Sequence, residues 1–422
     1  MSPDVYFSCV PAAHAFSQDG HPPCTLDIPL FNPGNARYHV AMKISAAILA
    51  ALGLVVSLYC NQAIAVDDYA ACRLPDMHIR RDVGLGFPRI PFRLKTTGEV
   101  RFTVLFVDFS DAPASRTPQD VMAIISPQAE QFFKAVSYGK LNLALMPNYK
   151  WIRMNKASSD YHMSRNTNSF DAHRAYIQEA VYLAGTSIDY AKTDAILVLA
   201  NPAVKVIDFG PGFSPSPGYG VTAGGREIDN GATSGSDLTN WGWPWFNHEI
   251  GHTMSLIDLA GPLPGNQLWY TYTGDFSVMG NPSGSAPEYF GWERWQLGWL
   301  DDDQVICAGK ATTRTQLSPI ERVGGTKMLI VPTGTTTAVV IESRHAEGYD
   351  HAIPKSGPLV YTIDTRLSSH DGAIRVFPVS DTDSHHLQSP LALGETLHID
   401  KVSITYVSGD AGGDTVEVQQ AN

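Results

Sequence analysis

The residues whose types and spacing best suit catalysis lie in segment 241–258, which reads WGWPWFNHEIGHTMSLID. Within it, His248, Glu249 and His252 form the pattern HExxH. Side chains four residues apart share one face of a helix, so the two histidines can bind one metal ion together. The carboxylate beside them is then placed to act as general base toward a metal-activated water. The alternative is an ordinary helix with two histidines on its surface.

Two features downstream strengthen the prediction of a metal site. Asp258 lies ten residues after His248, where the metzincin pattern HExxHxxGxxH/D has its third ligand. The segment 277–280, SVMG, resembles the methionine-containing turn beneath the metal in such sites, with Met279 as its methionine. We therefore predict a zinc site formed by His248, His252 and Asp258. In the alternative interpretation Asp258 faces water and Met279 is a core residue.

Strands that alternate with helices are expected to position this segment. The run 101–109 is apolar and β-branched, which is typical of a central strand. Helical spacing of apolar residues begins at Thr117, the expected N-cap, and continues to Val136. Residues 203–240 are rich in Gly, Ser, Pro and Asp and predict a long loop with an edge strand at 219–223. Further strands are expected at 141–151 and 195–200, and a further helix at 171–184.

Beyond residue 310 the pattern changes to short strands separated by Gly, Ser and Asp, which predicts a mostly antiparallel β-unit. We expect an α+β fold, with a catalytic domain at 101–305 that contains a twisted mixed sheet and an active-site helix. A β-rich C-terminal unit at 306–422 follows it. Residues 66–100 are expected to be either an N-terminal strap or a short propeptide. The expected C-terminal strands are 327–331, 338–342, 359–363, 374–379 and 402–407.

A targeting signal is expected near the amino end. Residues 42–65 combine a short positive region, an apolar run and the small residues Ala63-Ile64-Ala65, which is the pattern of a secretory signal peptide. The run is short and is interrupted by Gly53 and Ser57, which argues against a membrane anchor. We interpret residues 1–41 as an upstream extension that results from a start codon assigned too early. These features predict a secreted, extracellular protein with no membrane span in its mature chain.

Two cysteines follow the predicted signal peptide, Cys72 and Cys307. In an oxidising compartment two cysteines most often pair, so we expect a disulfide between them. The segment 72–76, CRLPD, also resembles the cysteine switch of matrix metalloproteinase propeptides, in which a thiolate occupies the catalytic zinc. The Gly that follows the cysteine in that family is absent here. A structural disulfide and a zinc-bound thiolate are therefore the two alternatives for Cys72.

The composition limits the classes of partner. Hydrophobic residues make up 44% of the 422 residues, which is enough for a buried core and excludes a wholly disordered chain. The formal net charge of −12, without a block of Lys and Arg, is a poor match for nucleic acid or for an anionic membrane surface. Proteins or peptides are the substrates that fit the predicted site.

Several segments together resemble the immune inhibitor A group of secreted zinc metallopeptidases. The matching pieces, spread over most of residues 101–408, include FVDFSD at 106–111, SYGKLNL at 137–143, HEIGHTMSLIDL at 248–259, FSVMG at 276–280, WERWQLGWL at 292–300 and VIESRHAEGYDHAIPKSGPLVYTID at 340–364. The resemblance implies a zinc endopeptidase with a zincin-type catalytic domain. It implies that His248 and His252 are ligands, that Glu249 is the catalytic base and that Asp258 is the third ligand.

The sequence departs from the group at two positions near the site. The group usually has Gly at the position of Ser255, where the turn is expected to need a positive φ, and tends to have Tyr at the position of Ala260. Ser adopts a positive φ at some energetic cost, so the first departure bears on where Asp258 lies. Some zincins take a glutamate from a downstream helix as third ligand, which makes Glu288 and Glu293 reserve candidates.

Weaker candidates surround the predicted site. The candidate donors to an oxyanion, for which packing is the alternative role, are Tyr270, Tyr272 and Tyr289. The candidates for a hydrophobic subsite, or equally for the core, are Trp241, Trp243 and Trp245. The substrate backbone is expected to pair with an edge strand drawn from residues 218–230. The carboxylates that are candidates for a structural Ca²⁺ site, or for simple solvation, are Asp108, Asp111, Asp189 and Asp194.

The function predicted from the sequence is that of a secreted zinc-dependent endopeptidase, with Zn²⁺ as cofactor and Glu249 as general base. The alternative is a secreted binding or adhesion protein with a structural or vestigial zinc site. An open coordination position and a carboxylate beside the metal favour the enzyme, because closed structural zinc sites use four protein ligands.

Overall fold

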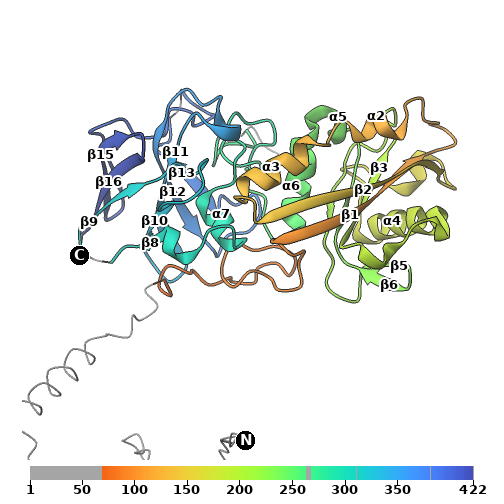
Figure 1. Cartoon of the computed structure of the whole chain (residues 1–422), viewed down its shortest axis with the longest axis horizontal. Helices are drawn as coiled ribbons and strands as arrows, with labels where there is room; N and C mark the ends of the chain where they lie inside the picture. Colours follow the sequence, from red (N-terminus) through yellow and green to blue (C-terminus); the bar gives the residue numbers. More distant parts are fainter. Residues whose placement is uncertain (1–68, 263–267, 310, 381, 422) are drawn as a thin grey trace, which may run out of the picture. The chain divides into compact units, whose positions relative to one another are not determined.

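The computed structural model describes residues 69–262, 268–309, 311–380 and 382–421 (Figure 1). The predicted extension 1–41 and signal peptide 42–65 lie outside the described residues. Within the described ranges, none of the helices combines the length and the apolar character that a bilayer crossing requires.

A five-stranded mixed sheet forms the first half of the described chain. Its strand order is β2-β1-β3-β7-β4. The strands are β1 (Gly98–Asp108), β2 (Leu141–Arg153), β3 (Ala195–Ala200), β7 (Gly231–Thr233) and β4 (Gly212–Phe213). The first four strands pair in parallel, and only the edge strand β4 runs antiparallel to its neighbour β7. The predicted strands at 101–109, 141–151 and 195–200 are β1, β2 and β3.

The two faces of this sheet bury different cores, as the alternation of side chains along a strand requires. On β1, Phe102, Val104 and Phe106 belong to one buried cluster, whereas Leu105 and Val107 belong to another. The first cluster includes residues of α3 (Gln128–Val136) and α6 (Trp243–Thr253). The second includes residues of α4 (Phe170–Ala184), so helices cover both faces of the sheet (Figure 1).

The single helix predicted from Thr117 to Val136 is wrong, because two helices occupy this range. Thr117 caps α2 (Pro118–Met122) as expected, and its hydroxyl accepts a hydrogen bond from the Asp120 amide. Pro127 then lies immediately before α3. A proline has no amide hydrogen to continue the helical ladder, which separates the two helices.

The glycine-rich segment after β3 contains more structure than a long loop. It supplies β4 and β7 of the main sheet and a separate hairpin of β5 (Val221–Ala223) and β6 (Arg226–Ile228). The predicted edge strand at 219–223 therefore corresponds to β5, which pairs with β6 and not with the main sheet. The short helix α5 (Asp237–Trp241) follows and leads into α6.

The C-terminal part is built from two sheets, connected to the first half by α7 (Gly291–Gln296). One sheet has the order β13-β12-β11-β10-β8 and the other β14-β15-β16-β9. Their strands are β8 (Val305–Cys307), β9 (Thr313–Leu317), β10 (Met328–Pro332), β11 (Thr337–Arg344), β12 (Gly357–Asp364), β13 (Ile374–Phe377), β14 (Thr396–Ile399), β15 (Val402–Asp410) and β16 (Gly413–Gln420). All recorded pairings within these two sheets are antiparallel except that of β8 with β10. The predicted α+β class is confirmed.

Residues 69–97 form an extended strap that is part of the folded unit. Cys72 and Leu85 lie in the same buried cluster as the main sheet, and Trp292 Nε1 donates to Leu85 O at 2.7 Å. Cys72 forms a disulfide with Cys307 of β8, with an S–S distance of 2.00 Å. The cysteine-switch alternative is wrong for this structure, because the sulfur of Cys72 is bonded to another cysteine.

Candidate metal centre

Helix α6 presents the two histidines of the HExxH pattern to a cleft. Phe246 and Ile250 are fully buried on its core side, while His248 and His252 are partly exposed on the other. The helix ends at Thr253, and the chain turns back through Ser255, whose φ of 89° is in the left-handed region. The positive φ expected at this position is therefore present, although the residue is not glycine.

This turn brings Asp258 to the two histidines. Asp258 Oδ1 lies 3.2 Å from His248 Nε2 and 3.4 Å from His252 Nε2, and the two Nε2 atoms are 3.1 Å apart. Throughout the described residues, these three side chains are the one group of three or more His, Cys, Asp or Glu whose potential ligand atoms all lie within 4.8 Å of one another. We call this group the His/Asp cluster.

The hydrogen bonds on the far side of each imidazole determine which ring nitrogen faces the cluster. His248 Nδ1 is 2.9 Å from Val278 O, and His252 Nδ1 is 2.9 Å from Leu256 O. A carbonyl only accepts, so each Nδ1 must carry the hydrogen and each neutral ring then points an Nε2 lone pair inward. Two nitrogen lone pairs and a carboxylate oxygen converge without a donor among them. Such an arrangement could hold a cation, and imidazole and carboxylate are among the ligand types that Zn²⁺ accepts.

The electrostatics of the cluster lead to the same conclusion. Burial lowers the pKa of His252, but the charge and hydrogen bond of Asp258 outweigh it and raise that pKa to about 9. Burial raises the pKa of Asp258, yet the two histidines hold it well below its ordinary value. The carboxylate of Asp258 therefore favours a positive charge at the cluster.

Glu249 lies beside the cluster and is held by the edge strand of the sheet. Its Oε2 accepts a hydrogen bond of 2.6 Å from the amide of Gly212 in β4. Burial raises its pKa above the ordinary 4.5, opposed by the neighbouring histidines. A Cβ on Gly212 would lie 2.9 Å from the Glu249 carbonyl oxygen, so the strand approaches α6 this closely because residue 212 is glycine. Sequence reasoning missed this residue, since glycines are frequent throughout the segment.

The turn that contains Met279 packs against α6, the helix that carries His248 and His252. Met279 is fully buried, and its Sδ would be only 2.4 Å from a Cβ on Gly251 of α6. The same turn supplies the Val278 carbonyl that orients His248. Met279 is thus a core residue that packs against α6, and its predicted role as the methionine of a turn beneath a metal stays a prediction.

Glu288 and Glu293, the reserve candidates for the third ligand, are bonded to residues outside the His/Asp cluster. Glu293 accepts hydrogen bonds from Ser277 Oγ at 2.8 Å and from the Phe290 amide at 2.9 Å, and burial raises its pKa to about 7. Glu288 forms a buried ion pair with Arg294. Neither belongs to the His/Asp cluster.

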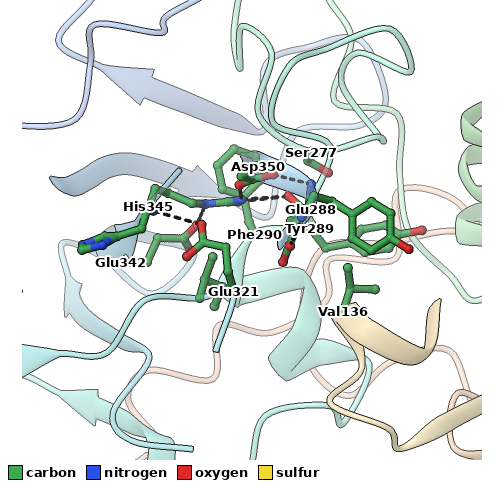
Figure 2. Close-up of polar contacts among 12 residues, drawn as sticks. Val136, Ser277, Glu288, Tyr289, Phe290, Glu321, Glu342, His345 and Asp350 are labelled. Atoms are coloured by element: carbon green, nitrogen blue, oxygen red, sulfur yellow. Dashed lines mark hydrogen bonds and ion pairs between the residues drawn. The ribbon is translucent and has the colours of Figure 1, made fainter. Parts of the chain in front are cut away.

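Glu288 is part of a buried ionic network between α7 and the C-terminal sheet (Figure 2). Arg344 of β11 donates to Glu342 at 2.7 Å, to Asp350 at 2.5 Å and to the carbonyl of Glu288 at 3.1 Å. The Arg344, Glu342 and Asp350 side chains are completely buried. This network joins the two halves of the described chain.

The His/Asp cluster opens into a cleft of about 840 Å³, a volume typical of ligand sites. Trp241 and Trp245 line it, as does Trp269, whereas Trp243 packs against Phe132 with ring centroids 5.2 Å apart. Trp269 was not predicted, although its neighbour Tyr270 was a candidate for another role. Ala260, at the position where the immune inhibitor A group tends to have Tyr, also lines the cleft.

The predicted oxyanion donors do not line this cleft. Tyr289 is fully buried and donates to the carbonyl of Asn247, Tyr270 stacks on a histidine, and Tyr272 packs under an arginine. The edge strand whose amide reaches Glu249 is β4, which precedes the range 218–230, and the pairing of substrate with that range stays a prediction.

The four aspartates considered for calcium are not gathered into one site. Asp108 pairs with Arg153, Asp111 accepts from Ser158, Asp189 accepts from the Ala191 amide and Asp194 pairs with Lys95. Each carboxylate already has its own protein partner, so nothing in their arrangement favours Ca²⁺.

A scan against protein-family models finds no match for this chain, and a search of curated proteins finds no significant match either. The resemblance to the immune inhibitor A group accordingly stays a prediction from the sequence segments.

Proposed function

We propose that this protein is a secreted zinc-dependent endopeptidase of the immune inhibitor A type, with a zincin-like catalytic domain. The observation that carries the proposal is the convergence of three acceptor atoms, from His248, His252 and Asp258, beside a buried glutamate and at the base of a cleft. A closed structural zinc site would use a fourth protein ligand, and none joins this group among the described residues.

Zinc held by these side chains would act as a Lewis acid that polarises a peptide carbonyl and acidifies water. The chain's own residues supply the remaining chemistry. Glu249 accepts the proton of the attacking water and returns it to the departing amine. The Gly212 amide orients the Glu249 carboxylate. Burial of that carboxylate raises its pKa, and a general base needs this higher proton affinity. The Cys72–Cys307 disulfide suits an oxidising extracellular location.

The test is to express the chain through an oxidising export route and to measure zinc content and the hydrolysis of a quenched peptide library on the same sample. We expect about one zinc per chain, as for a single catalytic site. Glu249→Gln keeps an oxygen acceptor for Gly212 and should retain zinc but lose hydrolysis. Glu99→Gln, at an exposed position in β1, is the matched control. Zinc without hydrolysis by the unmodified chain would favour the binding-protein alternative, and a chain without zinc would contradict the proposal.

A further inference from the structure

A loop of the C-terminal part reaches the His/Asp cluster. It connects β12 to β13, and its residues Ser369 and His370 line the cleft. The amide of Asp258 donates to Ser369 Oγ at 3.1 Å, across 111 residues of sequence. In return, the amide of His370 donates to the carbonyl of Asp258 at 3.4 Å. The backbone of Asp258 is therefore bonded on both its donor and its acceptor side to this loop.

The side chain of Asp258 also faces the loop. Its Oδ1 points at the two histidines of α6, while its Oδ2 lies 3.7 Å from His370 Nε2. A carboxylate that binds a metal through one oxygen leaves the other for an outer hydrogen bond, and such outer partners orient the ligand. His370 is the side chain placed to serve that outer oxygen.

The loop is itself held firmly, so it can act as a fixed support. The Thr365 amide donates to Thr336 O at 3.0 Å, and the Ser368 amide donates to Asp371 Oδ2 at 3.2 Å. Leu367 packs against the large core cluster. On the opposite side, the next residue after Asp258 donates its amide to Met279 O at 3.0 Å. Asp258 is thus held between the Met279 turn and the C-terminal loop.

This support matters because the turn that delivers Asp258 is strained. Ser255 has a positive φ, which favours glycine, so the turn alone does not fix the position of Asp258. We infer that Ser369 and His370 are positioning residues of the metal site, through which the C-terminal β-unit fixes Asp258 as third zinc ligand. This inference rests on the proposed zinc site and gives the C-terminal unit a part in it.

The experiment measures zinc affinity by competition with a chelator, using the exported full chain. Ser369→Ala removes the acceptor for the Asp258 amide. His370→Asn removes the imidazole and introduces a residue that tolerates a positive φ, which His370 has (71°). We expect each variant to bind zinc about 10- to 100-fold more weakly, as is typical when an outer-shell partner is lost. Ser369→Thr, which keeps the hydroxyl, and Ser368→Ala, in the same loop but not lining the cleft, should bind as the unmodified chain does.

A second measurement separates positioning from general damage to the fold. Because His370 is expected to act through Asp258, His370→Asn should weaken zinc binding no further in an Asp258→Ala background. The metal-free His370→Asn variant should also unfold at the same urea concentration as the unmodified chain. If both loop variants bind zinc as tightly as the unmodified chain, or if the loss persists without Asp258, the inference is overturned while the proposed function stands. If the unmodified chain binds no zinc, the proposed function itself fails.

Discussion

The His/Asp cluster and the buried ionic network are both groups of charged or ionisable side chains, but their carboxylates have different kinds of partner. In the network, the guanidinium of Arg344 meets the carboxylates of Glu342 and Asp350, and no solvent reaches the three side chains. In the cluster, three acceptors face one another and a cleft. A group whose acceptors pair with a cation of the chain serves the fold. A group whose acceptors converge at a cavity could instead bind a cation from outside the chain.

Breaking the network should give the largest change in stability. Arg344→Met leaves Glu342 and Asp350 buried without their cation, and removal of one partner from a buried ion pair costs about 3–5 kcal/mol. Urea unfolding measures the loss. Arg366→Met is the matched control, because Arg366 pairs with Asp364 at the surface with 60% of its side chain exposed, and it should change stability by less than about 1 kcal/mol. A fully stable Arg344→Met protein would contradict the structural role assigned to the network.

At the His/Asp cluster, bound zinc should change the free energy of unfolding more than a substitution does in the metal-free chain. At free zinc about 100-fold above the dissociation constant, binding to the folded state adds about 2.7 kcal/mol to the free energy of unfolding. A chelator should remove this stabilisation from the unmodified chain. His248→Ala should lose the response to chelator, since it removes one of the three ligand atoms, while its metal-free stability stays close to that of the unmodified chain. Equal chelator sensitivity of both proteins would show that zinc acts elsewhere.

The same contrast shows which parts of the molecule were predictable from the sequence. The site elements that lie within a few residues of one another were predicted: the shared face of His248 and His252, the return of the chain to Asp258, and the positive φ at Ser255. Strands such as β1 were predicted because an unbroken apolar run has few alternatives. These features depend on local spacing, which a sequence displays directly.

The features that were missed depend on contacts between distant segments. The approach of Gly212 to Glu249 spans 37 residues, and the bond from Asp258 to Ser369 spans 111. Nothing local distinguishes Ser369 from Ser368, the other serine of its loop. The break between α2 and α3 was missed for a different reason, because apolar periodicity outweighed Pro127 in the prediction although that residue cannot extend a helical ladder.

Two histidines, the partly exposed His252 and the buried His173, sharpen the comparison further, because their pKa values shift in opposite directions. His252 faces Asp258, which raises its pKa to about 9, whereas burial lowers the pKa of His173 to about 3. His173 Nε2 is 3.0 Å from the Thr233 hydroxyl, under the main sheet. A histidine whose folded pKa lies below its unfolded value of about 6.5 contributes stability that is present above that pH and is lost as the pH falls toward the folded pKa.

The unmodified chain should therefore lose about 2 kcal/mol through His173 between pH 7 and pH 5. His173→Gln cannot be protonated, so its stability should fall by that much less over the same range, as measured by urea unfolding at both pH values with chelator present. His398→Gln, at an exposed position, is the control and should follow the unmodified chain. If His173→Gln and the unmodified chain keep a constant difference in stability from pH 7 to pH 5, the buried neutral state assigned to His173 is wrong.

The smallest expected effect concerns the turn between the histidines and Asp258, where the demands of fold and site meet. Ser255 is fully buried with φ at 89°, and its hydroxyl has no hydrogen-bond partner. Ser255→Gly should relieve both the left-handed conformation and the unpaired hydroxyl, offset in part by the greater freedom of glycine in the unfolded chain, for a net gain of about 1 kcal/mol. Ser255→Ala removes only the hydroxyl, so comparing the two in urea unfolding separates the two contributions. A Ser255→Gly protein less stable than the unmodified chain would mean that the loop at Ser369 and His370 holds this turn without strain. If the gain is found, the same variant should bind zinc at least as tightly, because the turn then delivers Asp258 without opposing its ligands.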